Sequence, residues 1–422
     1  MLSITYTLNI GSEGCSAYYV LNELAKNTDH ETFIITNSVA HGTDISNFQF
    51  IKELRLNTNR LYWQAWFKIC AFSLSLIYTK CHHIGLIQQV LSDPFVPFFT
   101  PFRRALFVWL FAMKADPSFT PPNLAMDDND LLIFGELPNK LRKPHMSKNF
   151  IGNIGNFFKR RLATHFVNGL QRIITFLTTK NLSLVVAGTP YSFEFCKKIV
   201  SQRKVVFLPE AIDLSKFKYS QPPHNKILLT LAAMFAHEGI EVAIRAMKEI
   251  TYAEPDAMLN VLGDGPQMNN LKGLVEELGL TGNVQFHGYV ANEEVPSFFE
   301  QSRIVLLPAY VKSGGMTIKE AMAVGRPVVA TKAEGHLDSI EEGHDGFLVD
   351  LGDYKEMAKA SIRLLRDYDL CIQMSINAHA KATQMYNASS TAKKLAELYS
   401  ILVRNNPHGI NTLKDNGKKG SP

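Results

Sequence analysis

The chain of 422 residues is poor in cysteine and contains no long apolar run. Its five cysteines are widely scattered, and none belongs to a C-x-x-C pair. This pattern argues against a disulfide framework and against a zinc site, and it favours a reducing, cytoplasmic compartment. No stretch of 18 apolar residues is free of charge, so the sequence predicts no membrane-spanning helix. The first residues also lack the basic region of a signal peptide.

A strong excess of charge of one sign is also missing. The chain holds 44 Lys and Arg against 39 Asp and Glu, a net charge of +5, which does not favour a nucleic-acid partner. Acidic residues are absent only locally, between Glu136 and Glu194, where nine Lys and Arg fall. Apolar residues interleave these cations. Two interpretations stay open for residues 140–172: a basic amphipathic surface that docks on an anionic membrane, or the solvated face of an ordinary helix.

The first half of the chain shows the alternation of strands and helices that is typical of α/β proteins with a parallel sheet. Residues 50–125 are rich in aromatic side chains and have no regular period, so an irregular segment is expected there. The elements expected in this half are a strand at 2–8, a glycine loop at 9–15, a helix at 16–26, and strands at 32–36, 130–134, 182–187 and 205–208.

The second half alternates more regularly and predicts a second open, doubly wound domain, with ligands at the carboxyl ends of its strands. Its six strands are expected at 227–233, 258–262, 284–287, 303–307, 327–331 and 347–349. A polar, proline-containing segment at 213–225 separates the halves. The predicted organisation is an N-terminal domain at 1–210, a C-terminal domain at 211–389, a helix at 390–404 that packs back across the domains, and a flexible tail at 405–422.

An ordered series of short motifs runs through the second half. Each motif alone is a weak signal, because any one of them also fits a tight turn or a plain helix face. The series is Gly263-Asp264-Gly265-Pro266, Gly288-Tyr289, Leu307-Pro308, Ser313-Gly314-Gly315-Met316, Lys319-Glu320-Ala321-Met322, Gly325-Arg326-Pro327 and Gly346-Phe347-Leu348-Val349.

In order and spacing this series resembles the donor-binding half of the group 1 glycosyltransferases, glycosyltransferase family four. The resemblance is strong over residues 205–385 and weak over the first 200. It implies the GT-B fold, two Rossmann-like domains that face a cleft, with the first domain binding the acceptor and the second binding a nucleotide diphosphate-sugar. It further implies a transferase that retains anomeric configuration and works without a metal ion or another cofactor.

The central motif has a physical logic of its own. A strand that ends at Leu307-Pro308 passes through a glycine loop into a helix that begins near Met316, so free backbone N–H groups and the positive helix end favour an anion such as a diphosphate. The residues expected on the diphosphate are Ser313, Gly314, Gly315, Met316 and Thr317. The resemblance implies that Glu320 accepts hydrogen bonds from the ribose, that Gly263 and Asp264 belong to the donor site, and that Tyr289 lies near the base.

Two further features of the first half match the family weakly. The loop Gly11-Ser12-Glu13-Gly14 is similar to the glycine loop that lies over the donor phosphates and the acceptor, with Gly11 and Gly14 as its glycines. The pair His82-His83 is similar to a His-His found in one subgroup, which makes His83 a candidate catalytic residue on the acceptor side. A histidine pair that is satisfied in the core or exposed to solvent is an equally good interpretation, and no carboxylate or cysteine recurs at metal-ligand spacing.

The sequence departs from the family pattern where the diphosphate is expected. Ala233 stands in place of the usual arginine, Glu238 in place of the usual lysine, and Lys312 in place of the first glutamate of the E-x7-E motif. The missing arginine and lysine would each make a charge-assisted contact of about 1.5–3 kcal/mol. Diphosphate binding should therefore weaken by about 3–6 kcal/mol unless Lys312 replaces these two cations.

The most favoured function is therefore the transfer of a hexose from a nucleotide diphosphate-sugar to a saccharide or lipid-linked acceptor, in the assembly of surface polysaccharides or other glycoconjugates. The enzyme would be cytoplasmic, with residues 140–172 as its contact to the inner face of the membrane. Two alternatives stay open: a catalytically degenerate GT-B protein that serves as a binding or regulatory partner, and a nucleotide-sugar epimerase on the same fold.

Overall fold

The computed structural model divides the chain into two compact units. One unit comprises residues 1–12, 24–208 and 394–422, and the other comprises residues 13–23 and 209–393. The structure describes residues 2–10, 16–27, 31–39, 46, 50–53, 86–90, 106–110, 184–199, 205–310 and 315–404. The basic segment 140–172, the strand expected at 130–134 and the tail at 405–422 lie outside the described residues.

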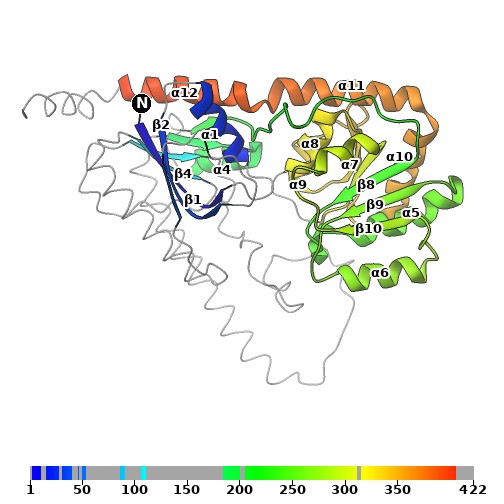
Figure 1. The fold of residues 1–422 in the computed structure, drawn as a ribbon. Helices are drawn as coiled ribbons and strands as arrows, with labels where there is room; N and C mark the ends of the chain where they lie inside the picture. The colour runs from blue at the N-terminus through cyan, green and yellow to red at the C-terminus, as the bar shows by residue number, and fades with distance from the viewer. Residues whose placement is uncertain are drawn as a thin grey trace, which may run out of the picture. The chain divides into compact units, whose positions relative to one another are not determined.

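The first unit is built on a seven-stranded parallel sheet in the order β3-β2-β1-β4-β5-β6-β7 (Figure 1). The strand–helix–strand start predicted for the chain is confirmed. The described elements of this half of the chain are β1 (Leu2–Ile10), α1 (Ser16–Asn27), β2 (Glu31–Val39), β3 (Phe50–Glu53), β4 (Leu86–Val90), β5 (Leu106–Leu110), β6 (Leu184–Ala187), α4 (Pro190–Ile199) and β7 (Val205–Phe207). Residues 16–23 of α1 are grouped with the second unit.

The expectation of an irregular segment over residues 50–125 is wrong in part. Three strands of the sheet lie there, namely β3, β4 and β5. They are only four or five residues long, and β5 is a short apolar run that periodicity alone cannot distinguish from a helix. Such strands are defined by their pairing partners in the sheet, which the sequence does not display.

The second unit contains a six-stranded parallel sheet in the order β10-β9-β8-β11-β12-β13, and its strands confirm the six predicted from the sequence. The strands are β8 (Ile227–Leu231), β9 (Met258–Leu262), β10 (Val284–Gly288), β11 (Ile304–Leu307), β12 (Val328–Thr331) and β13 (Gly346–Val349). The helices are α5 (Ile240–Ala253), α6 (Met268–Glu277), α7 (Val295–Gln301), α8 (Met316–Val324), α9 (Glu334–Leu337), α10 (Tyr354–Arg366), α11 (Tyr368–Met385) and α12 (Ala388–Arg404). Residues 394–404 of α12 are grouped with the first unit.

The sheet of the second unit is buried on both faces, as a parallel sheet covered by helices must be. Successive residues of β11 alternate between two cores: Ile304 and Leu306 join the cluster beneath α5, α6 and α10, whereas Val305 and Leu307 join the cluster beneath α7 and α8. The two layers of helices are visible on either side of the sheet in Figure 1. The period of two along one strand thus fixes which core each side chain of β11 enters.

The strand order of the second sheet reverses between β8 and β11. From β8 the chain continues outward to β9 and β10, and from β11 it continues in the opposite direction to β12 and β13. The connections that leave the carboxyl ends of β8 and β11 therefore diverge and open a crevice, which is where ligands bind in such sheets. The candidate site is therefore expected at this switch point, between the carboxyl ends of β8 and β11.

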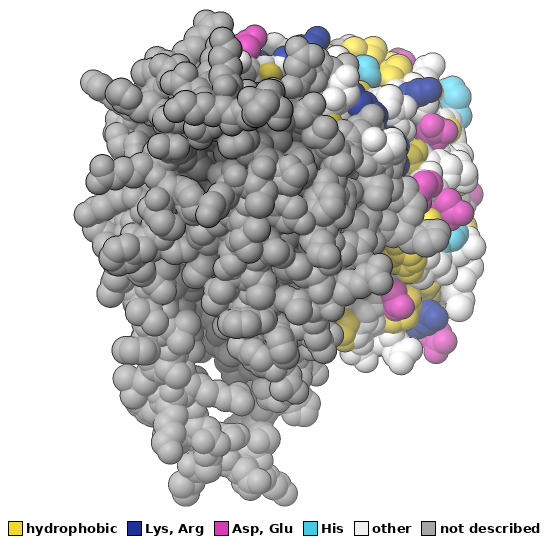
Figure 2. Space-filling model, turned by 60° about the vertical axis from the view of Figure 1, so that its left-hand side comes forward, with side chains coloured by type: hydrophobic (Ala, Val, Ile, Leu, Met, Phe, Trp, Pro, Cys, Tyr) yellow, Lys and Arg dark blue, Asp and Glu magenta, His cyan; other side chains and the backbone are white. Residues whose placement is uncertain are grey.

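The C-terminal helix predicted at 390–404 is present as α12. Three of its apolar residues are buried, with Ala392 exposed by 2% and Leu395 and Tyr399 fully buried. Within the described ranges, no helix combines the length and apolar character required to cross a membrane. On the face shown in Figure 2, acidic, basic and histidine side chains are interspersed over the described surface.

Candidate functional site

A pocket lies at the switch point of the second sheet. It is formed by the carboxyl end of β8, the carboxyl end of β11, the start of α8 and two polar side chains, Glu238 and His336. The remaining residues that line it are Thr230, Leu231, Ala232, Leu307, Pro308, Ala309, Gly315, Thr317 and Ile318. The topology and the motif series therefore lead to the same place.

The N-terminus of α8 supplies the anion-binding feature of this pocket. The helix begins at Met316, as predicted, and no side chain among the described residues caps it. Gly315 and Thr317 line the pocket, so the first turn, with its uncapped N–H groups and the positive end of the dipole, borders the cavity. A Cβ atom on Gly315 would lie 3.1 Å from Ile318 Cδ1, so this position is also crowded.

Glu320 follows one turn into α8 and is only 7% exposed. Its charge acts on Lys216, a partly buried cation of the segment before β8. Burial lowers the pKa of Lys216 below its usual value, and the nearby carboxylates of Glu293, Glu320 and Asp213 offset only part of this shift. Lys216 is thus a cation in the electrostatic neighbourhood of Glu320 that the sequence did not reveal, because a lone lysine in a polar segment carries no motif.

Glu238 occupies the position where the resemblance expects a phosphate-binding lysine. It ends a short 3-10 turn, η4 (Ala236–Glu238), and its carboxylate lies 3.7 Å from His237 Nε2. Because Glu238 lines the same pocket as Gly315 and Thr317, the predicted inversion of charge falls within the site itself. Ala233, which stands for the expected arginine, is exposed and does not line the pocket.

The backbone that carries Glu238 is held tightly despite the changed side chain. Gly239 has a φ of +67°, and a Cβ atom there would lie 2.2 Å from the carbonyl oxygen of Pro308. Tyr310 N–H donates to the carbonyl oxygen of His237 at 2.9 Å, and Tyr310 O–H donates to Glu241 Oε1 at 2.8 Å. The loop after β8 is therefore clamped to the end of β11 by close backbone approach.

The Gly-Asp-Gly-Pro turn supports the same loop from the other side. Gly263 has a φ of +121°, and a Cβ atom there would lie 1.9 Å from the carbonyl oxygen of Ala232. Met234 N–H donates to the carbonyl oxygen of Asp264 at 2.9 Å, while the Asp264 side chain accepts from Gly265 N–H at 2.7 Å. Gly263 and Asp264 thus shape the backbone of the site, and neither lines the pocket.

Tyr289 is not brought to the pocket. It follows β10, at the edge of the sheet beyond β9, and it is 69% exposed. The preceding His287 places Nε2 3.0 Å from Asn260 Oδ1, and burial lowers the pKa of His287. Met316 begins α8 but does not line the pocket either. Six predicted site residues lie outside the described residues, namely Gly11, Gly14, His83, Lys312, Ser313 and Gly314.

His336 is a pocket residue that the sequence did not reveal. It lies in the short helix α9 and is 1% exposed, with Nδ1 2.8 Å from the carbonyl oxygen of Thr331. This contact fixes the orientation of the ring beside the pocket. A single histidine in an Ala-Glu-Gly-His segment carries no recognisable spacing, so only the packing of α9 against β12 reveals it.

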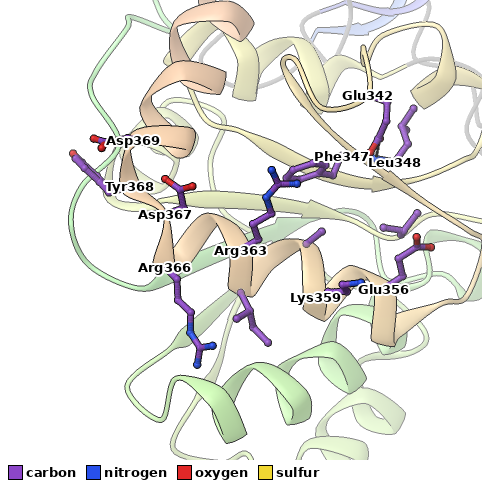
Figure 3. Close-up of a pocket in the computed structure, with 13 residues that line it drawn as sticks. Glu342, Phe347, Leu348, Glu356, Lys359, Arg363, Arg366, Asp367, Tyr368 and Asp369 are labelled. Carbon is purple, nitrogen blue, oxygen red and sulfur yellow. Dashed lines mark hydrogen bonds between the residues drawn. The ribbon is translucent and has the colours of Figure 1, made fainter.

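Two other polar features of the second unit are separate from the residues that line this pocket. A depression of about 950 Å³, shown in Figure 3, is lined by β13, α10 and the start of α11 and shares no residue with the switch-point pocket. There the Arg363 guanidinium lies 5.4 Å from the Phe347 ring centroid, and Arg366 Nε pairs with Glu254 at 2.6 Å. Among the described residues, Glu341, His344 and Asp345 also group their ligand atoms within 4.8 Å. Asp345 already accepts from Lys381 Nζ and from Glu341 N–H, at 2.8 Å each.

The fold places the chain in a class. Solved structures that are similar in fold include HepE from Anabaena, with a TM-score of 0.67 and 17% identity over 95% of this chain and all of that chain. They also include WaaG, with a TM-score of 0.64 and 16% identity over 94% of this chain and 99% of that chain. These are GT-B proteins, so the chain has the GT-B fold that the motif series implied.

Sequence comparison finds a family match in the second half of the chain. Residues 211–381 match the family described as glycosyl transferases group 1. Relatives include the alpha-D-kanosaminyltransferase of Streptomyces kanamyceticus, 33% identical over 41% of this chain and 45% of that protein. The D-inositol 3-phosphate glycosyltransferase of Corynebacterium kroppenstedtii is 32% identical over 47% of this chain and 45% of that protein. The chain spans about half the length of the curated relatives it matches.

Proposed function

We propose that the protein transfers a sugar from a nucleotide diphosphate-sugar to a saccharide or lipid-linked acceptor. The observation that carries the proposal is the N-terminus of α8 at the switch-point pocket, within a domain of the group 1 glycosyltransferase family. In this role the second unit binds the donor and the first unit binds the acceptor. HepE, which shares the fold, was crystallised with UDP and with UDP-glucose, which makes uridine nucleotides the first probes.

Roles for the individual residues are proposed on the same basis. The backbone of the first turn of α8, with Thr317 beside it, holds the diphosphate, and Ser313 and Gly314 stay candidates from the sequence alone. Glu320 accepts hydrogen bonds from the ribose hydroxyls. Lys312 and Lys216 supply positive charge that Ala233 and Glu238 do not.

The chemical step proposed is glycosyl transfer with retention of configuration and without a metal ion or other cofactor. The bond between the anomeric carbon and the diphosphate oxygen breaks, and the acceptor hydroxyl oxygen forms the new glycosidic bond. The proton of that hydroxyl passes to the departing nucleoside diphosphate. The protein contributes orientation of the two substrates and stabilisation of the charge that develops on the leaving diphosphate. His83 is the candidate residue on the acceptor side.

A binding screen tests this proposal before any acceptor is known. Calorimetric titration with UDP, GDP, UDP-glucose and GDP-mannose is expected to show binding of at least one nucleoside diphosphate. If none of these nucleotides binds, the result favours the alternative that Ala233 and Glu238 suggest. In that case the protein is a GT-B protein that has lost its catalytic activity and serves as a binding partner. Conversion of a UDP-sugar into its epimer in the absence of an acceptor would instead identify an epimerase.

The cellular setting is also proposed from the sequence. Nine cations fall in an acid-free stretch, so residues 140–172 are proposed to hold the enzyme at the inner face of a membrane, where surface polysaccharides are assembled. Sedimentation with vesicles of phosphatidylglycerol and phosphatidylcholine at low salt should carry the protein down, and neutral phosphatidylcholine vesicles serve as the control. Equal recovery in the supernatant with both vesicles contradicts the membrane contact.

A further inference from the structure

Lys319 is a buried cation in a helix that is otherwise apolar along most of its buried face. Every residue of α8 from Ile318 to Val324 is buried, and Lys319 itself is 4% exposed. Its Nζ donates to Glu210 Oε2 at 2.8 Å, and Glu210 is 2% exposed. Removal of two ions from water is costly, and a pair of well-packed apolar residues is often at least as stable. Stability alone therefore does not account for the pair.

Glu210 lies beside one of the points where the chain passes from one unit to the other. The chain crosses between the units at residues 12–13, 23–24, 208–209 and 393–394, and Glu210 follows the third of these crossings. The entering segment pairs with the segment that leads out: Ile212 N–H donates to the carbonyl oxygen of Tyr386 at 2.8 Å, and Ala388 N–H donates to the carbonyl oxygen of Ile212 at 3.1 Å. Two of the segments that connect the units, those that follow residue 208 and precede residue 394, are thus hydrogen-bonded to each other within the second unit.

Lys319 contacts both of these segments. Besides its bond to Glu210 on the entering segment, its Nζ lies 5.4 Å from the ring centroid of Tyr386 on the outgoing segment. Tyr386 is 3% exposed, so this cation–π contact is shielded from water. The residue after Lys319 is Glu320, and the first turn of α8 borders the pocket. One ammonium group therefore joins the pocket helix to both connecting segments.

We infer that Lys319 is a positioning residue. Through its contacts with Glu210 and Tyr386 it couples the position of α8 to these two connecting segments. Because α8 is proposed to bind the donor, donor binding is coupled to the same segments. This inference rests on the proposed function, because it assigns α8 to the donor. An ionic contact of fixed geometry specifies one arrangement of the helix, whereas an apolar pair of similar volume permits neighbouring ones. Donor binding at α8 and movement of the connecting segments are then linked in both directions.

The first test replaces both ions by residues of similar volume, in the double variant Glu210→Met with Lys319→Met, so that no buried charge is left alone. The control variant changes another ion pair of the same unit, Asp345→Asn with Lys381→Met, whose atoms lie 2.8 Å apart. Amide hydrogen exchange at Ile212 and Ala388 is expected to be at least tenfold faster in the first variant and unchanged in the control. Unchanged exchange in both variants contradicts the coupling.

The second test measures nucleotide affinity by titration with UDP and with GDP. The first double variant is expected to bind at least tenfold more weakly than the wild type, while the swapped variant Glu210→Lys with Lys319→Glu recovers part of the loss. A lower urea midpoint with unchanged affinity would show a structural role only and overturns the inference. If the wild type binds neither nucleotide, the proposed function fails, and the exchange at Ile212 and Ala388 alone decides whether Lys319 joins α8 to the connecting segments.

Discussion

The two sides of the switch-point pocket differ in what they keep of the family pattern. On the α8 side, the glycine before the helix, the helix start and Glu320 all stand where the motif series places them. On the side of the loop after β8, the backbone is clamped by Gly239 and Gly263, yet the expected cations are replaced by Ala233 and Glu238. The backbone of the site thus keeps its geometry where the side-chain charge has changed, so we expect the proposed anion binding to depend on α8.

The largest expected effect comes from Gly239, where the loop after β8 lies against the backbone at the end of β11. Gly239→Ala introduces a Cβ atom 2.2 Å from the Pro308 carbonyl oxygen at a φ of +67°, which combines left-handed strain with a clash against backbone. We expect a loss of about 3–4 kcal/mol in the free energy of unfolding, measured by urea denaturation, together with loss of nucleotide binding.

Gly279→Ala is the matched control for this clamp. Gly279 has nearly the same φ, +68°, and no atom lies within 4 Å of the place that a Cβ atom would take there, so only the strain of about 1–2 kcal/mol is expected. Equal losses in the two variants would mean that close approach to Pro308 contributes nothing to the site.

The second effect tests the α8 side. Glu320→Ala should weaken binding of UDP or GDP by about 1.5–3 kcal/mol, because a carboxylate that accepts from two hydroxyls is lost. The same titration with inorganic pyrophosphate, which has no ribose, should be unaffected. If pyrophosphate binding falls equally, Glu320 acts on the fold of α8 and not on the ribose.

The third effect tests the altered side directly. Glu238→Lys exchanges a negative charge for a positive one at the pocket, and we expect binding of UDP or GDP to strengthen by about 1–2 kcal/mol at low salt. Glu249→Lys changes the charge of the chain equally on the exposed side of α5 and serves as the control. An equal gain in both variants would show that net charge, and not the pocket, is responsible.

The smallest expected effect is a dependence of stability on pH that comes from Glu241, the carboxylate bonded by Tyr310. Burial raises the pKa of Glu241 above its usual value of 4.5, although the hydrogen bond from Tyr310 opposes this. A carboxyl with a raised pKa in the folded state binds its proton more tightly there than in the unfolded chain. Its contribution to stability is therefore full below pH 4.5 and is lost as the pH rises through the folded-state pKa.

Glu241→Gln removes this titration while keeping an acceptor for Tyr310. We expect the urea midpoint of the wild type to fall relative to that of the variant as the pH is raised above 4.5. Parallel curves over the same range would show that Glu241 titrates as it does in the unfolded chain.

Much of the second unit was predictable because its signals are local. Its strands other than β10 are short, largely apolar runs, and β10 alternates apolar and polar residues. The sequence Gly263-Asp264-Gly265-Pro266 indicates a turn by itself. The start of α8 at Met316 follows from the glycines before it. The order and spacing of the family motifs then indicated the two-domain fold, which periodicity alone does not predict.

The parts that escaped prediction depend on contacts between distant segments. The strands β3, β4 and β5 are recognisable by their partners in the sheet and not by their own residues. Lys319 and Glu210 are 109 positions apart, and a lysine in a helix reads as exposed until its partner is known. His336 and Lys216 likewise lack any motif, and the turn at Gly263 shapes the loop while not lining the pocket.

The central claim is that a nucleoside diphosphate binds at the N-terminus of α8. Amide hydrogen exchange of the wild-type protein, with and without saturating UDP or GDP, measures this directly. The account predicts that the nucleotide slows exchange at the amides of Gly315, Met316 and Thr317 more than at any other part of the second unit. Nucleotide binding that leaves these three amides unchanged, or no binding at all, would contradict it.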